Sequence, residues 1–167
     1  MQPLKYLTGY PADTLLKVQE MISGETLGEY LLKKYPQAHT VTTDNALYEY
    51  TQALKNRFMG KTRPLTKVCY DNKIKVIQHA LGQHAYISRV QGAQLKTVNE
   101  IRIASLFRNA PEPMLKMIVV HELSHFKEKD HNKAFYQLCR HMEPGYHQLE
   151  FDLRLYLTQQ DLFGELY

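Results

Sequence analysis

The chain has little that would place it in a membrane or in an oxidising compartment. Its apolar stretches are far shorter than the roughly 20 residues that a membrane-spanning helix needs. Its first residues lack the basic-then-apolar order of a secretory signal. It has only two cysteines, Cys69 and Cys139, too few for a disulfide framework, so we expect both to be small buried residues. These absences predict a cytoplasmic protein with no membrane contact.

The overall composition is that of an ordinary folded protein. The chain has 167 residues, of which 44% are hydrophobic and 23% are charged, and this length suits one core. We therefore predict a single domain over residues 1–167. Residues 1–60 would form a helical N-terminal part, and residues 65–167 would hold a sheet and the helices that carry the site.

The hydrophobic pattern predicts helices around a small mixed sheet. Apolar residues recur at helical spacing between Asp13 and Tyr35, with a break near Ser23 and Gly24. Further helices are predicted over residues 44–58, with Asp44 as N-cap, and over residues 114–126, 133–142 and 146–159. Strands are predicted as a hairpin of residues 68–70 and 74–77 turning at Asp71-Asn72, and at residues 85–90 and 100–104. Helices that flank a small sheet define an α+β fold.

Positive charge gathers in one segment. The stretch from Lys55 to Lys75 has seven basic residues and one acidic residue, so its net charge is +6, against +4 for the whole chain. Such a basic patch is often only a solvated helix end and hairpin. Phosphate, an acidic protein or a nucleic acid would also bind it.

The most informative segment is His121-Glu122-Leu123-Ser124-His125. Two histidines four residues apart on a helix lie on one face, so both imidazoles can reach one ion. Glu122 follows the first histidine, where a carboxylate can act as general base on a water molecule. As plain core residues, these groups would need other partners, because unpaired buried polar groups cost about 1–3 kcal/mol each.

A third histidine extends this motif. On an unbroken helix, His131 would lie about 240° around the axis from His125. The helix must therefore end between Phe126 and Asp130 for the three imidazoles to converge, and Asp130 or Asn132 can cap the next helix. Three neutral imidazoles leave the fourth position of a tetrahedral Zn²⁺ ion to water, as in catalytic sites. We predict one Zn²⁺ ion held by His121, His125 and His131, with Glu122 as catalytic acid/base.

Several other residues could contribute to this site. A downstream carboxylate, Glu143 or Glu150, is the alternative third ligand, although the spacing favours His131. Four aromatic residues could orient an oxyanion or a ligand, and the sequence does not choose among Tyr136, His141, Tyr146 and His147. Arg102 alternates with Ile101 and Ile103, so substrate contact and solvation are both open for it.

These residues carry a family resemblance. The segment Ile118–His125, with His131 and the aromatic Phe135, resembles the YgjP-like metallopeptidase family, which is related in its core to SprT-like zinc peptidases. The resemblance implies a zincin-like α+β fold in which His121, His125 and His131 match the zinc ligands and Glu122 the catalytic residue. Many members carry a Trp-Gly-Ser-Cys segment, whereas this chain has no tryptophan.

Three functions follow from these observations. The main interpretation is a zinc metallopeptidase whose peptide or protein substrate pairs with the strand near Glu100–Ala104. The alternative is a metal-dependent nucleotide phosphoanhydride hydrolase that holds phosphates with the basic patch between Lys55 and Lys75. A third possibility is a nucleoprotein-associated protease or binding module that uses this patch on DNA.

Overall fold

Helices and a small two-stranded sheet make up the computed structural model, which describes residues 4–74 and 100–167. The elements are α1 (Ala12–Ser23), α2 (Leu27–Lys34), α3 (Asp44–Phe58), β1 (Lys67–Asp71), β2 (Glu100–Ala104), the 3₁₀ helix η2 (Ser105–Asn109), α5 (Glu112–Ser124), α6 (Lys133–Met142) and α7 (Tyr146–Phe163). The predicted α+β fold class is therefore confirmed. None of the helices in the described ranges is both long and apolar enough to cross a bilayer.

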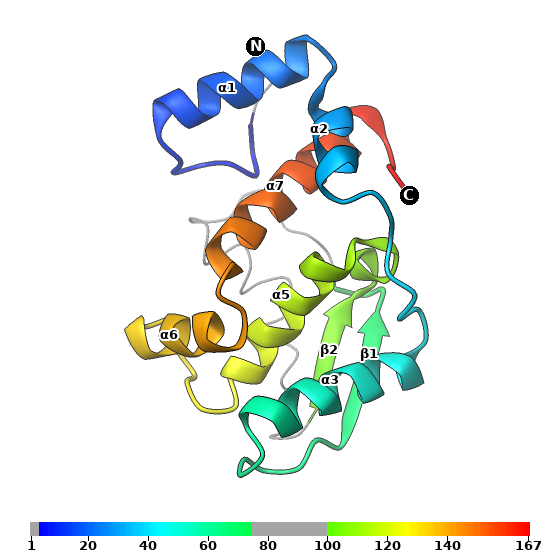
Figure 1. The fold of residues 1–167 in the computed structure, drawn as a ribbon, viewed down its shortest axis with the longest axis vertical. Helices are drawn as coiled ribbons and strands as arrows, with labels where there is room; N and C mark the ends of the chain where they lie inside the picture. The colour runs from blue at the N-terminus through cyan, green and yellow to red at the C-terminus, as the bar shows by residue number, and fades with distance from the viewer. Residues whose placement is uncertain (1–3, 75–99) are drawn as a thin grey trace.

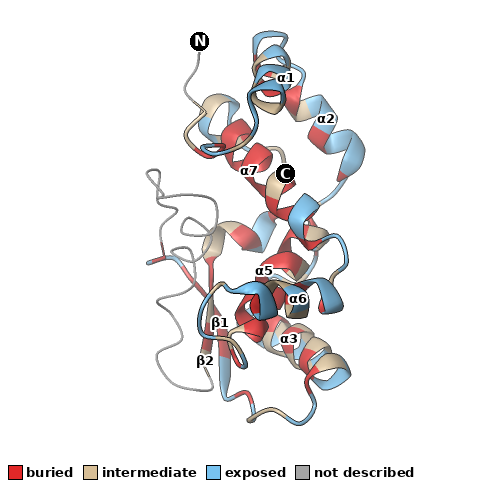
Figure 2. Cartoon of the chain, turned by 90° about the vertical axis from the view of Figure 1, so that its left-hand side faces the viewer, coloured by how far each residue is buried: buried red, intermediate tan, exposed pale blue. Residues whose placement is uncertain are grey.

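Helix α5 lies at the centre of this arrangement. It contacts β2, α3, α6 and α7, whereas α1 and α2 pack together beside α7 at the other end of the molecule (Figure 1). Ten of the 13 residues of α5 are buried, and the helix is red along most of its length in Figure 2. A helix buried on nearly all sides has little polar surface, so polar residues within it need a specific reason to be there.

The two described strands pair in parallel. Val68 lies opposite Ile101 and Tyr70 opposite Ile103, and all four side chains are buried. The predicted turn follows β1, since the Asp71 carboxylate accepts a hydrogen bond from the backbone N–H of Lys73. The predicted hairpin partner is not seen at Ile74, which belongs to no strand. Residues 75–77 and the predicted strand 85–90 lie outside the described residues.

Most helix ends agree with the pattern, with two corrections. The break after Ser23 and the helix over residues 133–142 are confirmed. The N-cap of α3 is Thr43, whose hydroxyl accepts from the backbone N–H of Ala46 at 3.1 Å. Asp44 instead accepts from the backbone N–H of Tyr70 at 2.9 Å, which ties α3 to β1. Helix α7 runs beyond residue 159 to Phe163.

Charged side chains enter the core along α7. Asp152 has no exposed surface and accepts hydrogen bonds from Tyr35 and from Gln148, and it pairs with Lys34 at 2.7 Å. Arg154 donates to the backbone carbonyl of Tyr6 at 2.8 Å. Buried charges are tolerated when they are paired in this way, so these contacts fasten the N-terminal segment and α2 to α7.

Candidate metal centre

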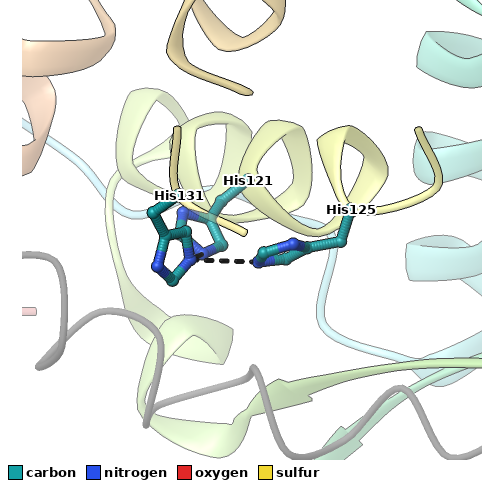
Figure 3. Close-up of side chains that lie close together, drawn as sticks. All are labelled: His121, His125 and His131. Atoms are coloured by element: carbon teal, nitrogen blue, oxygen red, sulfur yellow. Dashed lines mark hydrogen bonds between the residues drawn. The ribbon is translucent and has the colours of Figure 1, made fainter. Parts of the chain in front are cut away.

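Three imidazoles converge at the end of α5. His121 lies in the last turn of α5, His125 directly follows the helix, and His131 precedes α6. The Nε2 atom of His131 is 3.3 Å from that of His121 and 3.2 Å from that of His125. One ligand atom from each residue lies within 4.8 Å of the other two, and the three rings gather on one side of the helix (Figure 3). The structure thus brings together all three predicted ligands.

The chain reaches this geometry because α5 stops after Ser124. The backbone N–H groups of Phe126 and Lys127 bond to the carbonyls of Leu123 and Ser124 at 3.0 and 3.1 Å, and this three-residue spacing tightens the backbone into a turn that ends the α-helix. Asn132 then caps α6 by accepting from the backbone N–H of Phe135 at 2.8 Å. The predicted helix break is therefore present, but α5 ends at Ser124, before the predicted range of Phe126 to Asp130, and Asn132 rather than Asp130 is the cap.

A buried aromatic ring supports the cluster. The Phe135 ring has no exposed surface, and its centroid lies 4.9 Å from His121, 4.7 Å from His125 and 4.9 Å from His131. The first turn of α6 thus places an apolar support against all three imidazoles, which restricts their rotation.

The outer nitrogens of two histidines are engaged. His125 Nδ1 lies 2.9 Å from the Glu128 carbonyl oxygen, which can only accept, so Nδ1 carries the proton and Nε2 keeps its lone pair. His121 Nδ1 lies 2.7 Å from the hydroxyl of Tyr146, which is buried at the start of α7. Burial lowers the pKa of His125, which favours the neutral imidazole that a metal requires.

Glu122 directly follows His121 in the sequence, and its side chain is fully buried. Neither of its carboxylate oxygens receives a hydrogen bond from any residue within 4–74 or 100–167. Burial alone raises the pKa of Glu122 well above its usual value. A buried carboxylate without donors is unfavourable unless a cation or a bound molecule compensates it. The donor set and this carboxylate therefore fit a bound metal ion.

The alternative third ligands are placed elsewhere. Glu143 faces Lys116 at 3.8 Å, and Glu150 pairs with Arg154 at 3.7 Å within the core. Neither carboxylate joins the histidine cluster found among the described residues.

Of the four aromatic candidates, Tyr146 is the one that bonds to a proposed ligand. The Tyr136 ring lies 6.3 Å from that of His131 and 5.5 Å from that of His147, while His141 packs against Phe58 on α3. Tyr146 is 25 residues from His121 in sequence, and only the packing of α7 on α5 brings them together. No periodicity in the sequence marks that contact.

The basic patch divides in the folded chain. Lys55 is 3% exposed and its ammonium group donates to the Thr62 carbonyl, so it orders the loop after α3 and adds nothing to the surface. Lys67 and Lys73 are exposed but flank opposite ends of β1, and Lys75 lies outside the described residues. Lys55 therefore does not belong to a surface patch, and Lys67 and Lys73 lie apart along β1.

One cation of this segment contacts the residue that follows His125. Arg63 is half-buried, donates to the Phe126 carbonyl at 3.3 Å and stacks 4.7 Å above the Phe126 ring. Arg63 thus ties the loop after α3 to the chain directly beyond a proposed ligand.

The fold and the site define the class of protein. Paired histidines on a buried helix, a third histidine after it and an adjacent buried glutamate are the parts of a metal-dependent hydrolase. The model of the YgjP-like metallopeptidase domain matches residues 71–156. The UTP pyrophosphatase of Escherichia coli (strain K12) is 60% identical over 162 residues, which cover 97% of each chain. The chain belongs to the YgjP-like family, as its motif predicted, and no solved structure matches it.

The relative's activity contradicts the main functional interpretation. A protein 60% identical over nearly the whole chain is a pyrophosphatase, so the prediction of a metallopeptidase is wrong and the phosphoanhydride alternative fits better. The physical reason is that a metal site with a general base activates water, and activated water attacks a phosphoryl group as well as a carbonyl. The motif specifies the nucleophile and leaves the electrophile open.

Proposed function

We propose that this protein is a metal-dependent nucleotide pyrophosphatase that hydrolyses UTP. The observation that carries the proposal is the convergence of three imidazole Nε2 atoms at the helix that bears the buried, donor-free Glu122. The full-length similarity to a UTP pyrophosphatase supports the substrate class.

We assign one Zn²⁺ ion to His121, His125 and His131. Three neutral imidazoles are a typical catalytic zinc set, whereas Mg²⁺ prefers oxygen ligands and would arrive with the nucleotide. When bound, the zinc ion would polarise a phosphoryl oxygen and lower the pKa of a water molecule at its open position.

Glu122 is assigned the proton transfers. In the reaction, the oxygen of water forms a bond to the α-phosphorus of UTP. The bond from this phosphorus to the oxygen that bridges it to the β-phosphorus breaks. Glu122 accepts the proton that the water loses and returns it to the departing diphosphate. Its burial suits this role, because no described side chain competes for the carboxylate.

Arg63 is assigned to the phosphates of the substrate. Its guanidinium group is fixed against Phe126, one residue beyond His125, and it offers a planar fork of donors that matches phosphate oxygens. We assign no role in substrate binding to Lys55, which is buried, or to Lys67 and Lys73, which lie apart along β1.

The decisive experiment compares wild type with Glu122→Gln. Purified wild type supplied with UTP and Mg²⁺ should release UMP and diphosphate, measured by ion-exchange chromatography, and mass spectrometry should find about one zinc per chain. Glu122→Gln should keep the zinc and lose about 10²- to 10⁴-fold in kcat, the range expected for general acid–base catalysis.

A matched control is Glu112→Gln in the first turn of the same helix. Glu112 lies ten residues before Glu122, about 15 Å along the axis, and accepts a hydrogen bond from Tyr50. This variant should retain wild-type turnover. Wild-type activity in Glu122→Gln would refute the assigned base, and wild type that releases no diphosphate from UTP would refute the function.

A further inference from the structure

The His121 imidazole is held by a side chain that belongs to another helix. Its Nδ1 atom lies 2.7 Å from the hydroxyl oxygen of Tyr146, and its Nε2 atom lies 3.3 Å from Nε2 of His131. His121 is in the last turn of α5, whereas Tyr146 is the first residue of α7. One ring nitrogen of His121 therefore faces the histidine cluster while the other is bonded to α7.

This contact is enclosed in the core. Neither His121 nor Tyr146 has any exposed surface, so bulk water cannot take the place of the hydroxyl at Nδ1. The Phe135 ring meets the His121 ring at 4.9 Å with an interplanar angle of 76°. The imidazole is thus held by an apolar ring and by one polar atom, and the polar atom is the one that can choose a direction for the ring nitrogens.

The turn before α7 fixes where Tyr146 lies. Helix α6 ends at Met142, and the backbone N–H of Tyr146 bonds to the Glu143 carbonyl at 3.0 Å. The Glu143 carboxylate faces the ammonium group of Lys116 at 3.8 Å, and Lys116 lies on α5, five residues before His121. The turn is therefore tied to the same helix that carries the ligand.

The comparison with His125 shows what the hydroxyl does. His125 Nδ1 donates to the Glu128 carbonyl, which leaves Nε2 with its lone pair. A cation on Nε2 of His121 likewise requires the proton of the neutral ring on Nδ1, so the Tyr146 oxygen accepts it. Burial raises the pKa of Tyr146 well above its usual value, so this acceptor is a neutral hydroxyl.

We propose that Tyr146 is a positioning residue for the metal, whose hydroxyl accepts from Nδ1–H of His121 and holds the imidazole with Nε2 directed at the cation. It does for His121 what the Glu128 carbonyl does for His125. Tyr146 acts through His121 and is therefore not a catalytic residue. The inference rests on the proposed role of His121 as a zinc ligand and requires nothing of the nucleotide.

The first test is Tyr146→Phe, which keeps the ring and removes the hydroxyl. Zinc affinity, measured by competition with a chelator, should fall by about 10- to 100-fold, the usual contribution of a residue that holds a metal ligand. The visible absorption of the Co²⁺-substituted protein, which reports ligand geometry, should also change. Equal zinc affinity in Tyr146→Phe and wild type would overturn the proposal.

A matched control is Tyr156→Phe in the same helix. Tyr156 is also buried, and its hydroxyl accepts from Gln160 at 3.0 Å, away from the histidines in sequence. This variant should keep the zinc affinity and the Co²⁺ spectrum of wild type. The same loss of affinity in both variants would show that Tyr146 contributes only to the packing of α7, and would overturn the assigned role.

The second test needs no variant. Nitrogen-15 NMR of the zinc-loaded wild-type protein reports which nitrogen of His121 carries the proton, and a nuclear Overhauser contact reports which ring lies beside it. We expect a proton on Nδ1, close to the Tyr146 ring, and the metal on Nε2. Zinc on Nδ1, or a Nδ1 proton far from Tyr146, would overturn the inference. Failure to hydrolyse UTP would refute the proposed function alone, because none of these readouts uses nucleotide.

Discussion

We expect Arg63 to contribute to substrate binding through its guanidinium group. Two contacts with Phe126, a hydrogen bond to its carbonyl and stacking on its ring, hold that group against the residue that directly follows His125 in sequence. Arg57, a few residues earlier, is exposed and stacks on Phe58 at 4.9 Å. The two arginines have the same chemistry, but the contact of Arg57 lies within α3 and not beside a proposed ligand.

We expect Arg63→Gln to weaken UTP binding while the metal stays bound. Hydrogen bonds to charged groups contribute about 1.5–3 kcal/mol, so KM should rise by about 10-fold or more at unchanged zinc content. Steady-state kinetics on Arg57→Gln provide the matched control, which should behave like wild type. The same rise in KM in both variants would mean that general positive charge, rather than Arg63, attracts the nucleotide.

Single residues of the site were predictable to different degrees. Helical periodicity alone brings His121 and His125 to one face, and the polar residues after Phe126 predicted that the helix ends before His131, although it already ends at Ser124. Tyr146 was one of four equal candidates, because its contact depends on how α7 packs on α5. Arg63 was included in a basic segment without distinction, since only tertiary structure joins it to Phe126.

The paired strands are joined by an ion cluster centred on Arg102, the middle residue of β2. Arg102 on β2 contacts Asp71 on β1 at 3.0 Å and Glu100 at 2.8 Å. The sequence left substrate contact and solvation open for Arg102. The structure shows a third role, because Arg102 links β2 to β1 through Asp71. The pKa of Asp71 is lowered, first by the backbone N–H of Lys73 and then by Arg102.

This lowered pKa predicts a pH-dependent contribution to stability. The ionised Asp71 stabilises the fold fully above its unfolded pKa, which is about 3.9, and the contribution disappears as pH falls through the lower folded value. Asp71→Asn should therefore reduce Tm at pH 7, and the difference from wild type should shrink below about pH 4. Thermal unfolding followed by circular dichroism tests this. A difference that is constant with pH would show that the charge of Asp71 contributes nothing.

Helices were easier to predict than strand pairing. A helix repeats its apolar pattern locally, so α3 and α6 were predicted closely from spacing and caps. The parallel register of Lys67–Asp71 with Glu100–Ala104 joins segments far apart in the chain, and no local pattern encodes it. Helix α7 was predicted too short because its last residues, 160–163, are half-buried or exposed and add little to its apolar stripe.

Metal binding should stabilise the whole molecule. Without a cation, the chain must keep Glu122 buried without donors and three imidazoles within 4.8 Å of one another. An ion that binds only the folded state at 100 times its Kd adds about 2.7 kcal/mol, or roughly 5–10 °C in Tm for a chain of this size.

Calorimetry with and without zinc measures this increase. His131→Ala should lose most of the rise in Tm, whereas His141→Ala, which removes an exposed histidine that packs against Phe58, should keep it. An equal rise in both variants would indicate that zinc binds somewhere other than the cluster.

The substrate could not be predicted from the sequence. A buried helix with two histidines and a glutamate predicts activated water, and that prediction applies equally to peptides and to nucleotides. What distinguishes them is the surface around the histidine cluster, whose ligands come from the end of α5 and from the segment before α6.

One helix links the two ends of the molecule. Tyr146, at the first turn of α7, touches His121, and Asp152, less than two turns later, receives the bonds of Tyr35 and Lys34. Holding the first turn of α7 in place therefore also stabilises the contacts that bind α2 to α7. A cation that orders the imidazoles should therefore also reduce motion in α2, at the other end of the molecule. An assay that measures only the catalytic residues would miss that effect.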